Sequence, residues 1–346
     1  MARPKSRTNV KATESQSGLL DALKFCKLVT KSEGPVCDTH ILLGNNAAIA
    51  FNGILAAGCK ISEDITCAPN ADLIVQALSK CGEQLSITQL DNGRLSIKSG
   101  KFKCIVSCID PQLLTVAIPD APLAIIDDRF KEAIEAVSVL ASDTAQSVVA
   151  ASVLMAGASI IATDRKMLME AWHGIDLPYG IALPKAFAVA LTKIPKKLTK
   201  FGFSQSSCTF YFEDESWLRT QFYAEPWPDV RGILDRKCNA WPVPNDFWKA
   251  LDAIEPFAEE DCVFFDNGIM RSHLVKSNID NPKDWADEGA SYECYGIPKG
   301  PIFTIKQLNI IRPYVKQIDF MAPGMHTSTM CIWYGDKVRG AIAGRE

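Results

Sequence analysis

The chain has 346 residues, of which 47% are hydrophobic and 22% charged, and its formal net charge is −3. This length exceeds one ordinary hydrophobic core and predicts two or three domains, while the lack of any long apolar run argues against a membrane span and a secretory signal, so we expect a cytoplasmic protein. The negative charge argues against a protein that coats nucleic acid, and twelve cysteines without a CxxC pair indicate reduced thiols.

The first third of the chain is predicted to contain a basic tail, two helices and six strands. Residues 1–16 are polar, carry four basic side chains and lack periodic apolar residues, which predicts a mobile tail. Helices are expected from Leu19 to Val29 and after Pro69, the second with an apolar face of Leu73, Ala77, Leu78 and Cys81. The strands are expected at 39–43, 47–51, 54–61 and, around an Asp91-Asn92-Gly93 turn, between 85 and 110.

The middle third repeats this order, with a helix at 127–142 and strands at 147–155 and 159–163. The second strand runs into the polar corner Thr163-Asp164-Arg165-Lys166 and out through Met167 and Leu168, so two strands meet at a tight turn. Pro184 fits the first position of a helix at 184–195, whose buried face holds Phe187, Leu191 and Ile194. Three further strands (201–204, 208–213 and 216–224) lead to Pro228-Asp229-Val230-Arg231.

The last third passes through the same order once more. It offers a helix at 245–254, a turn at Asp266-Asn267-Gly268 between two strands, a polar looped segment at 278–289, a helix at 303–312 and three closing strands. Three passes of about 115 residues each indicate three copies of one domain. We expect an α+β protein in which every domain packs two helices on antiparallel sheet, with domains at 17–120, 121–237 and 238–346.

The middle third also resembles a known family. The Ala162-Thr163-Asp164 corner, the Pro184-led helix and Pro228-Asp229-Val230-Arg231 match the pattern Ala-Thr-Asp-Gly-His-Arg-Leu, then Pro and a helix, then Phe-Pro-Asp-Tyr-Arg, of the bacterial-type DNA polymerase sliding clamp, the beta subunit of DNA polymerase III. The resemblance covers the chain from about Leu19 to the C-terminus. It implies a non-enzymatic processivity factor that closes a head-to-tail homodimeric ring around duplex DNA of any sequence and tethers a DNA polymerase. A clamp loader is the other implied partner.

The resemblance is thin outside the middle third, which is typical of a divergent member. One interpretation is a phage protein that acts in the host cytoplasm. The chain also departs from the family pattern: Arg165 replaces a glycine, Gly344-Arg345-Glu346 replaces an apolar tail, and the loop from Asp143 to Val148 lacks an arginine and tyrosines.

The distribution of charge is consistent with a DNA-facing surface. Residues 184–200 hold five lysines and no acid, and residues 304–316 hold three basic residues and no acid, although the whole chain is acidic. Positive helices inside a negative ring would hold a duplex by its phosphates without reading bases. For any single lysine, solvation of an exposed helix stays an alternative. The candidates are Lys24, Lys27, Lys31, Lys185, Lys193, Lys196, Lys197, Lys306, Arg312 and Lys316.

The resemblance further implies a hydrophobic cleft between the second and third domains that receives a short apolar peptide from polymerases and the loader. Matched residue by residue, its walls are Thr163, Lys166, Met167, Leu168, Pro228, Gly232, Ile233 and Ile342. An exposed apolar groove with a polar rim suits partner recognition. The alternative for the apolar members is an ordinary place in the core.

The remaining predictions concern the dimer interface and catalysis. The strand from Phe102 to Ile109 would leave an unpaired edge for another subunit, with Phe102, Cys104, Val106 and Phe257 as interface candidates. The histidines (His40, His173, His273, His326) are dispersed, and no phosphate-binding glycine loop or G-x-S-x-G elbow occurs, so we expect no metal, no cofactor and no enzyme. Two rival interpretations remain: a non-ring scaffold or virion protein of repeated α+β domains, and an enzyme with a cleft between the repeats.

Overall fold

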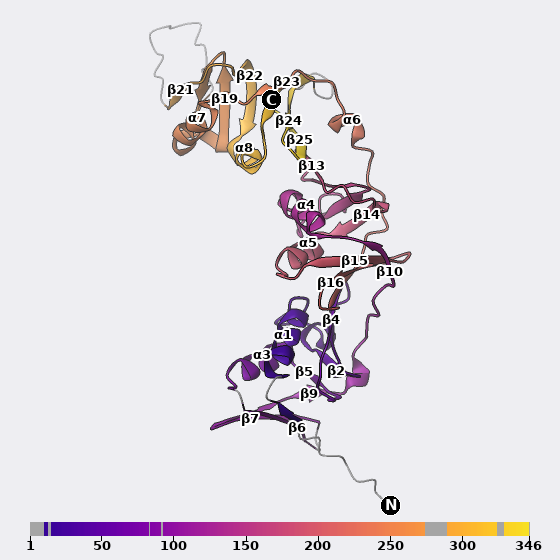
Figure 1. Ribbon diagram of the computed structural model, residues 1–346. Helices are drawn as coiled ribbons and strands as arrows, with labels where there is room; N and C mark the ends of the chain where they lie inside the picture. The colour runs from indigo at the N-terminus through magenta and orange to yellow at the C-terminus, as the bar shows by residue number, and fades with distance from the viewer. Residues whose placement is uncertain are drawn as a thin grey trace, which may run out of the picture. The chain divides into compact units, whose positions relative to one another are not determined.

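The computed structural model describes residues 10–12, 15–82, 84–90, 93–273, 289–323 and 329–345. The expected turn residues Asp91 and Asn92, most of the looped segment 278–289 and His326 lie outside these residues. The chain forms two compact units, Met1–Lys131 with Leu183–Ala224 and Glu132–Ala182 with Glu225–Glu346 (Figure 1). Their boundary passes through the expected middle domain, so the division into three domains stays a prediction.

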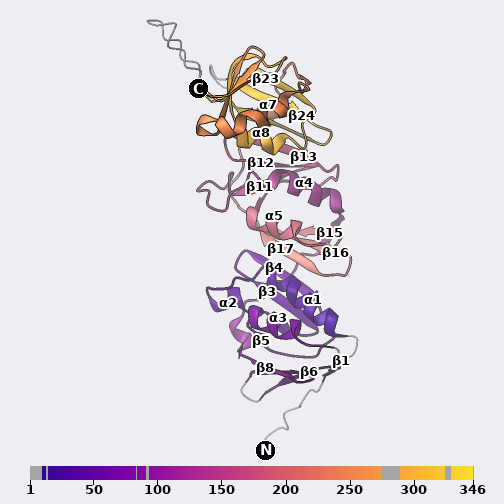
Figure 2. The same ribbon diagram turned by 90° about the vertical axis from the view of Figure 1, so that its left-hand side faces the viewer.

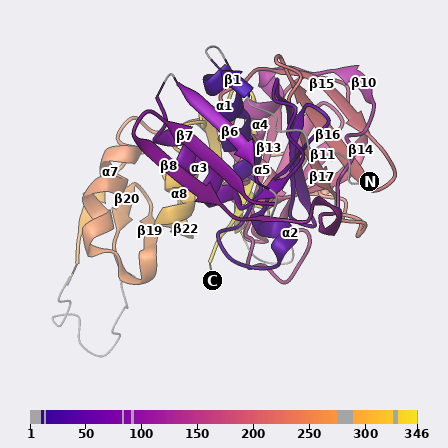
Figure 3. The same cartoon turned by 90° about the horizontal axis from the view of Figure 1, so that it is seen from below.

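The first unit contains three antiparallel sheets. Their strand orders are β1-β6-β7-β8, β10-β15-β16-β17-β4-β3-β2 and β5-β9, and Figure 3 shows β6, β7 and β8 side by side. The strands are β1 (Val10–Ala12), β2 (Leu42–Gly44), β3 (Ala47–Phe51), β4 (Leu55–Lys60), β5 (Ala68–Pro69), β6 (Leu85–Gln89), β7 (Leu95–Ser99), β8 (Phe102–Val106), β9 (Cys108–Ile109), β10 (Pro122–Ile125), β15 (Leu198–Phe203), β16 (Ser207–Phe212) and β17 (Trp217–Gln221).

The helices of the first unit are α1 (Ser15–Lys27), α2 (Val36–Thr39), α3 (Ala71–Ser79) and α5 (Lys185–Thr192), and α4 (Asp128–Ser138) begins here and continues into the second unit. Of these helices, α3 and α5 bury apolar stripes and the short α2 buries Asp38 and Thr39. In Figure 2, α1 and α3 lie next to each other in front of β3 and β4. Asn70 caps α3 by accepting the Leu73 N–H at 3.1 Å, and the helix begins at Ala71, two residues after Pro69.

The second unit contains an eight-stranded sheet, β14-β11-β12-β13-β25-β24-β23-β18, and a four-stranded sheet, β21-β20-β19-β22. The strands are β11 (Ser152–Ala156), β12 (Ser159–Thr163), β13 (Met167–Trp172), β14 (Tyr179–Pro184), β18 (Trp241–Pro242), β19 (Cys262–Asp266), β20 (Ile269–Arg271), β21 (Ser291–Glu293), β22 (Lys299–Thr304), β23 (Gln317–Pro323), β24 (Thr329–Tyr334) and β25 (Val338–Ala343). The helices are α6 (Arg231–Leu234), α7 (Phe247–Ile254) and α8 (Ile305–Ile311), and the 3-10 turns are η2 (Glu255–Phe257) and η3 (Glu259–Asp261).

The two faces of the eight-stranded sheet differ. On one face Phe320 packs against Phe247 of α7, Phe265 and Phe303, with ring centroids 5.0–6.1 Å apart, and builds the aromatic core under the helices. The other face carries the segment that connects the middle and last thirds, including α6; its N-cap residue Val230 and its Leu234 join a cluster with Leu168. Alternation of side chains along each strand separates the two sets.

The order of elements repeats three times, as the sequence predicts. In each third, three strands follow the first long helix (β2–β4, β11–β13, β19–β21) and three follow the second (β6–β8, β15–β17, β23–β25). The final strand of the middle part of the chain, β17, pairs with β4, the strand that closes the first set of three in the preceding part. In the same way, β25 of the last part pairs with β13 of the middle part, and both pairs are antiparallel. This rule leaves β8 and β21 at the edges of their sheets. The predicted α+β fold class is confirmed.

Four local predictions need correction. The basic tail is shorter, because Val10 of β1 pairs with Ile87 of β6 and α1 starts at Ser15. The strand expected from residue 39 begins only at Leu42, since α2 precedes it. The strand expected at 147–155 begins at Ser152. In α3, Leu73 is exposed and the buried residues are Ala71, Ile74, Val75, Ala77 and Leu78, because Ile74 and Val75 take the buried face in place of Leu73.

Candidate functional site

An apolar groove of about 300 Å³ lies in the second unit, on the sheet face that carries α6. Four parts of the chain build it: Val149 before β11, the β12–β13 turn with the start of β13, the segment around α6, and strands β24 and β25. The lining residues are Val149, Thr163, Arg165, Lys166, Met167, Leu168, Pro228, Val230, Ile233, Thr329, Met330, Ala341 and Ala343. Most are apolar, and Arg165, Lys166 and Thr329 supply polar groups.

Side-chain hydrogen bonds fix the β12–β13 turn. Thr163 Oγ1 donates to the Met167 carbonyl at 2.6 Å and accepts the Arg165 N–H at 2.9 Å. Asp164 Oδ1 accepts the N–H groups of Lys166 (2.8 Å) and Met167 (2.6 Å). Arg165 has φ of 76°, a left-handed conformation that costs a non-glycine residue about 1 kcal/mol or more. The turn of the family pattern is therefore kept, with an arginine in the place that favours glycine.

The opposite wall is the segment from Trp227 to Leu234. The Trp227 indole N–H donates to Ser152 Oγ at 3.0 Å, and Asp229 Oδ1 accepts the Arg231 N–H at 2.9 Å and starts α6. Ile233 is partly buried and packs against both apolar clusters of this sheet face. These contacts place Val230 and Ile233 against β13 and β25.

The structure brings six of the eight predicted groove residues together, namely Thr163, Lys166, Met167, Leu168, Pro228 and Ile233. Ile342 is fully buried on the other sheet face, because neighbouring residues of a strand point to opposite sides, and Ala341 and Ala343 line the groove in its place. Gly232 does not line the groove either, whereas Val230 does. Sequence reasoning also missed Val149, Arg165, Thr329 and Met330. The period-two alternation of β25 was the signal that could have found the two alanines.

The equivalent junction in the first unit is filled. There β17 meets β4 as β25 meets β13, and Ala56, Ala117 and Trp217 form a cluster flanked by Ile49, Phe51 and Tyr211. Gly58 leaves room for the indole, since a Cβ at this position would collide with the Trp217 ring. The large indole thus occupies the space beside the connecting segment.

Five of the ten DNA-facing candidates form ion pairs. Their N···O distances are 2.5 Å for Lys27–Asp72, 2.7 Å for Lys31–Asp38, 2.6 Å for Lys196–Asp214, 2.6 Å for Arg312–Asp252 and 2.6 Å for Lys316–Asp336. Lys196 Nζ also donates to Ser216 Oγ and lies 4.3 Å from the centroid of the Phe25 ring. Hydrogen bonding from the Arg312 guanidinium holds the pKa of Asp252 below its usual range.

Four of the other candidates present their charge more freely. Lys24 in α1, Lys193 and Lys197 after α5, and Lys306 in α8 are exposed. Among the described residues, no carboxylate lies within ion-pair distance of these four ammonium groups. Lys185 is half-buried. Contact of any of them with DNA stays a prediction.

The interface candidates lie on two different features. Phe102, Cys104 and Val106 belong to the edge strand β8, where Val106 is buried and the other two are half-buried. Ile105 of the same strand is exposed. Phe257 is exposed at the end of η2, outside the free edge strand β21. Phe257 therefore does not lie on an unpaired strand edge, whereas the β8 candidates do.

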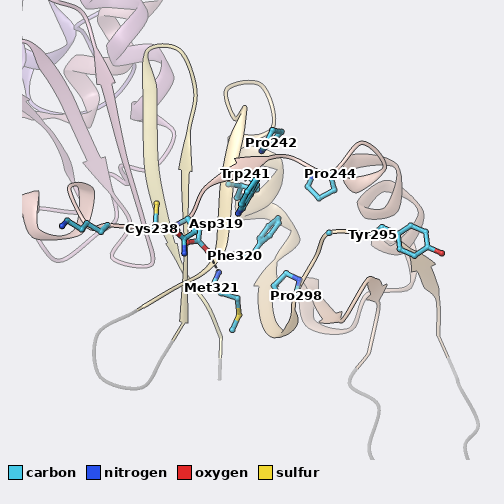
Figure 4. A pocket seen from close by; sticks show the side chains of 13 residues that line it. Cys238, Trp241, Pro242, Pro244, Tyr295, Pro298, Asp319, Phe320 and Met321 are labelled. Carbon is cyan, nitrogen blue, oxygen red and sulfur yellow. Dashed lines mark hydrogen bonds between the residues drawn. The ribbon is translucent and has the colours of Figure 1, made fainter.

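A larger cavity of about 830 Å³ lies beside the edge strand β18 (Figure 4). Trp241, Phe320, Pro244 and Pro298 lie around it. Asp319 is the one carboxylate among its lining residues, and its oxygens accept the backbone N–H groups of Asn239 (2.8 Å) and Met321 (2.9 Å). This carboxylate is held as a structural acceptor, which does not favour a general base here.

Within the described residues, no group of three or more His, Cys, Asp and Glu side chains is placed to hold a metal ion. The described helices also include none that is long and apolar enough to cross a membrane.

Comparison with known proteins identifies the fold. No family model matches the sequence, and no curated protein matches it either. Among solved structures, a putative DNA polymerase III beta subunit from Eubacterium rectale superposes with a TM-score of 0.78 at 10% identity, covering 98% of this chain and 99% of that one.

Two further structures give the same result. The DNA polymerase III subunit beta from Pseudomonas aeruginosa has a TM-score of 0.76 at 12% identity, with 99% of this chain and 100% of that one covered. The Helicobacter pylori beta clamp bound to a DNA ligase peptide has a TM-score of 0.74 at 12% identity, with 98% and 100% covered. The predicted resemblance is confirmed at the level of structure: this chain has the fold of the bacterial DNA polymerase sliding clamp.

Proposed function

We propose that this protein is a sliding clamp, a processivity factor that encircles duplex DNA as a homodimer and tethers a DNA polymerase. The observation that carries the proposal is the pairing rule of the fold. β17 pairs with β4 and β25 with β13, so the same rule pairs β8 of one copy with β21 of another. Applied twice, the rule closes two copies into a ring without leaving either edge unpaired.

The apolar groove supports a tethering role. A cavity of about 300 Å³ with apolar walls and a polar rim fits two or three apolar side chains of a short peptide. The Helicobacter pylori clamp binds a DNA ligase peptide, and we transfer peptide binding to this chain as part of the proposal. The expected partners are the tail of a DNA polymerase and a subunit of the clamp loader.

The exposed lysines support sequence-independent contact with DNA. Lys24, Lys193, Lys197 and Lys306 come from helices or helix ends. Ammonium groups attract phosphates without reading bases, so affinity for short linear duplex should be weak and should fall steeply with salt.

Retention on circular DNA tests the proposal. The protein is loaded onto a nicked circular plasmid by replication extract of its source and isolated with the DNA by gel filtration. A ring held by topology stays on the circle and is lost when a restriction enzyme linearises it. Equal retention on circular and linear DNA, or tight binding to one short sequence, would contradict encirclement.

A further inference from the structure

A second cavity, of about 470 Å³, lies beside the apolar groove on the same sheet face. Leu168 of β13 lines the groove, and Glu170 and Trp172 of the same strand line the second cavity. On β25, Ala341 pairs with Leu168 and lines the groove, whereas Arg339 pairs with Glu170 and lines the second cavity. Side chains two residues apart on a strand point to the same face, so the two cavities follow one another along β13 and β25.

A buried carboxylate organises the second cavity. The Glu170 side chain is 6% exposed, and its Oε1 accepts from Ser159 Oγ (2.6 Å) and from Arg231 Nη1 (3.1 Å). Its Oε2 accepts from Arg339 Nε at 2.6 Å. Each nitrogen of the Arg339 guanidinium has a partner, since Nη1 also donates to the Leu234 carbonyl (3.1 Å) and Nη2 pairs with Asp235 (2.9 Å).

This network leaves positive charge in the cavity. Arg231 engages Glu170 through Nη1 alone, and its side chain is 37% exposed. Lys337 lines the same cavity, and within the described part of the chain no carboxylate lies within ion-pair distance of its Nζ. Asp336, the other lining acid, is paired with Lys316 at 2.6 Å. The groups that remain to meet a ligand are thus cationic.

Trp172 adds an apolar surface next to these cations. Its side chain is 56% exposed at the end of β13, although tryptophan is usually well covered. Gly174 follows with φ of 72°, and a Cβ there would crowd the indole ring. The ring therefore lies open beside the cavity as a flat contact surface for a peptide chain.

We propose that this cationic cavity is a second subsite for the peptide that occupies the apolar groove, and that it takes an acidic side chain of that peptide. The proposal rests on the proposed function of the groove. Glu170 and Trp172 lie about 7 and 13 Å beyond Leu168 along β13, because a strand advances about 3.3 Å per residue. An extended peptide covers this distance in about two to four residues. The acid therefore stands two to four positions from the apolar anchors.

Arg231 links the two subsites. It belongs to α6, where its neighbours Val230 and Ile233 line the groove. An acid that pairs with Arg231 and Lys337 would gain a charge-assisted contact at a half-exposed site, which is worth about a threefold to tenfold gain in affinity at low salt. The same contact is screened at high salt, whereas the apolar anchors are not.

Fluorescence anisotropy with the full chain tests the subsite. The probes are labelled synthetic peptides with Leu-Leu-Phe between serine-glycine flanks, and matched peptides carry two glutamates or two lysines two to four positions before or after the apolar core. We expect one glutamate peptide to bind about threefold to tenfold more tightly than the serine peptide at low salt, with the gain lost at high salt. Equal affinity of serine and glutamate peptides, or tighter binding of a lysine peptide, would overturn the subsite.

A variant pair assigns the effect to the cavity. Lys337→Glu should abolish the preference for glutamate and leave the affinity of the serine peptide unchanged, whereas Lys80→Glu, at an exposed lysine that ends α3, should change neither. An unchanged preference in Lys337→Glu would refute the assignment. If the serine peptide binds and Ile233→Ala weakens it while glutamate adds nothing, the groove stands and only the subsite fails. If no peptide binds, the groove and the subsite both fail.

Discussion

Ile233 is the residue whose truncation separates peptide binding from folding. It lies in α6, lines the groove and is only partly buried, so its side chain packs against two apolar clusters and is also accessible from the groove. Ile233→Ala removes three carbon atoms from that wall. At about 0.8 kcal/mol per fully buried methylene group, and with the peptide covering only part of the side chain, the loss is about 1–2 kcal/mol. This loss is about a fivefold to thirtyfold weaker affinity.

The assay is anisotropy with the Leu-Leu-Phe peptide, together with thermal unfolding of the free protein. Ile233→Ala should weaken the peptide and lower the melting temperature only slightly, because a partly exposed side chain leaves a small cavity. A control at Ile54, exposed in the turn between β3 and β4, should leave peptide affinity unchanged when replaced by alanine. Wild-type affinity in a folded Ile233→Ala variant would refute the groove as the docking site.

Three further predictions concern the core, the DNA surface and acid stability. Met167 is 1% exposed, so Met167→Ala should destabilise the fold by about 2–5 kcal/mol in denaturant unfolding, and a change below about 1 kcal/mol would show a surface role. The double variant Lys193→Glu and Lys197→Glu should lose retention on circular DNA with unchanged melting, whereas Lys196→Glu should melt earlier because it breaks the contacts to Asp214 and Phe25. The depressed pKa of Asp252 contributes stability above the ordinary carboxyl value of about 3.9, and this contribution is lost as pH falls through the lower folded-state pKa. Asp252→Asn should therefore reduce the fall in melting temperature between about pH 4 and lower pH. An unchanged fall would contradict the ion pair.

The sequence predicted the positions of the helices and strands better than it predicted which of their side chains are buried. Hydrophobic periodicity located α1, α5 and α7, because each buries one stripe on a sheet. It misplaced Leu73, because Leu73, Ile74 and Val75 are three consecutive apolar residues of α3 and the pattern alone does not decide which of them are buried. It also missed β1, because this strand has only three residues, inside a polar segment, and pairs with β6, which is distant in sequence.

The groove shows the same limit. Six of its residues follow from the family pattern, because the turn at Thr163 and the segment at Pro228 keep their local chemistry. Ile342 was misassigned because the C-terminal strand had no motif to fix its register, and a shift of one residue turns every side chain to the other face. The Glu170–Arg231–Arg339 network joins residues that are far apart in sequence, so spacing alone offered no signal for it.

Equilibrium sedimentation at micromolar concentration tests the ring most directly. We expect a dimer, held by β8 of one copy against β21 of the other. Ile105 on β8 is 48% exposed and Ile54 elsewhere in the same unit is 46% exposed, so the two form a matched pair. Ile105→Asp places a charge on the edge strand and should give a folded monomer, while Ile54→Asp should stay dimeric. A wild-type monomer or trimer, or an Ile105→Asp variant that remains a dimer, would contradict closure through these strands.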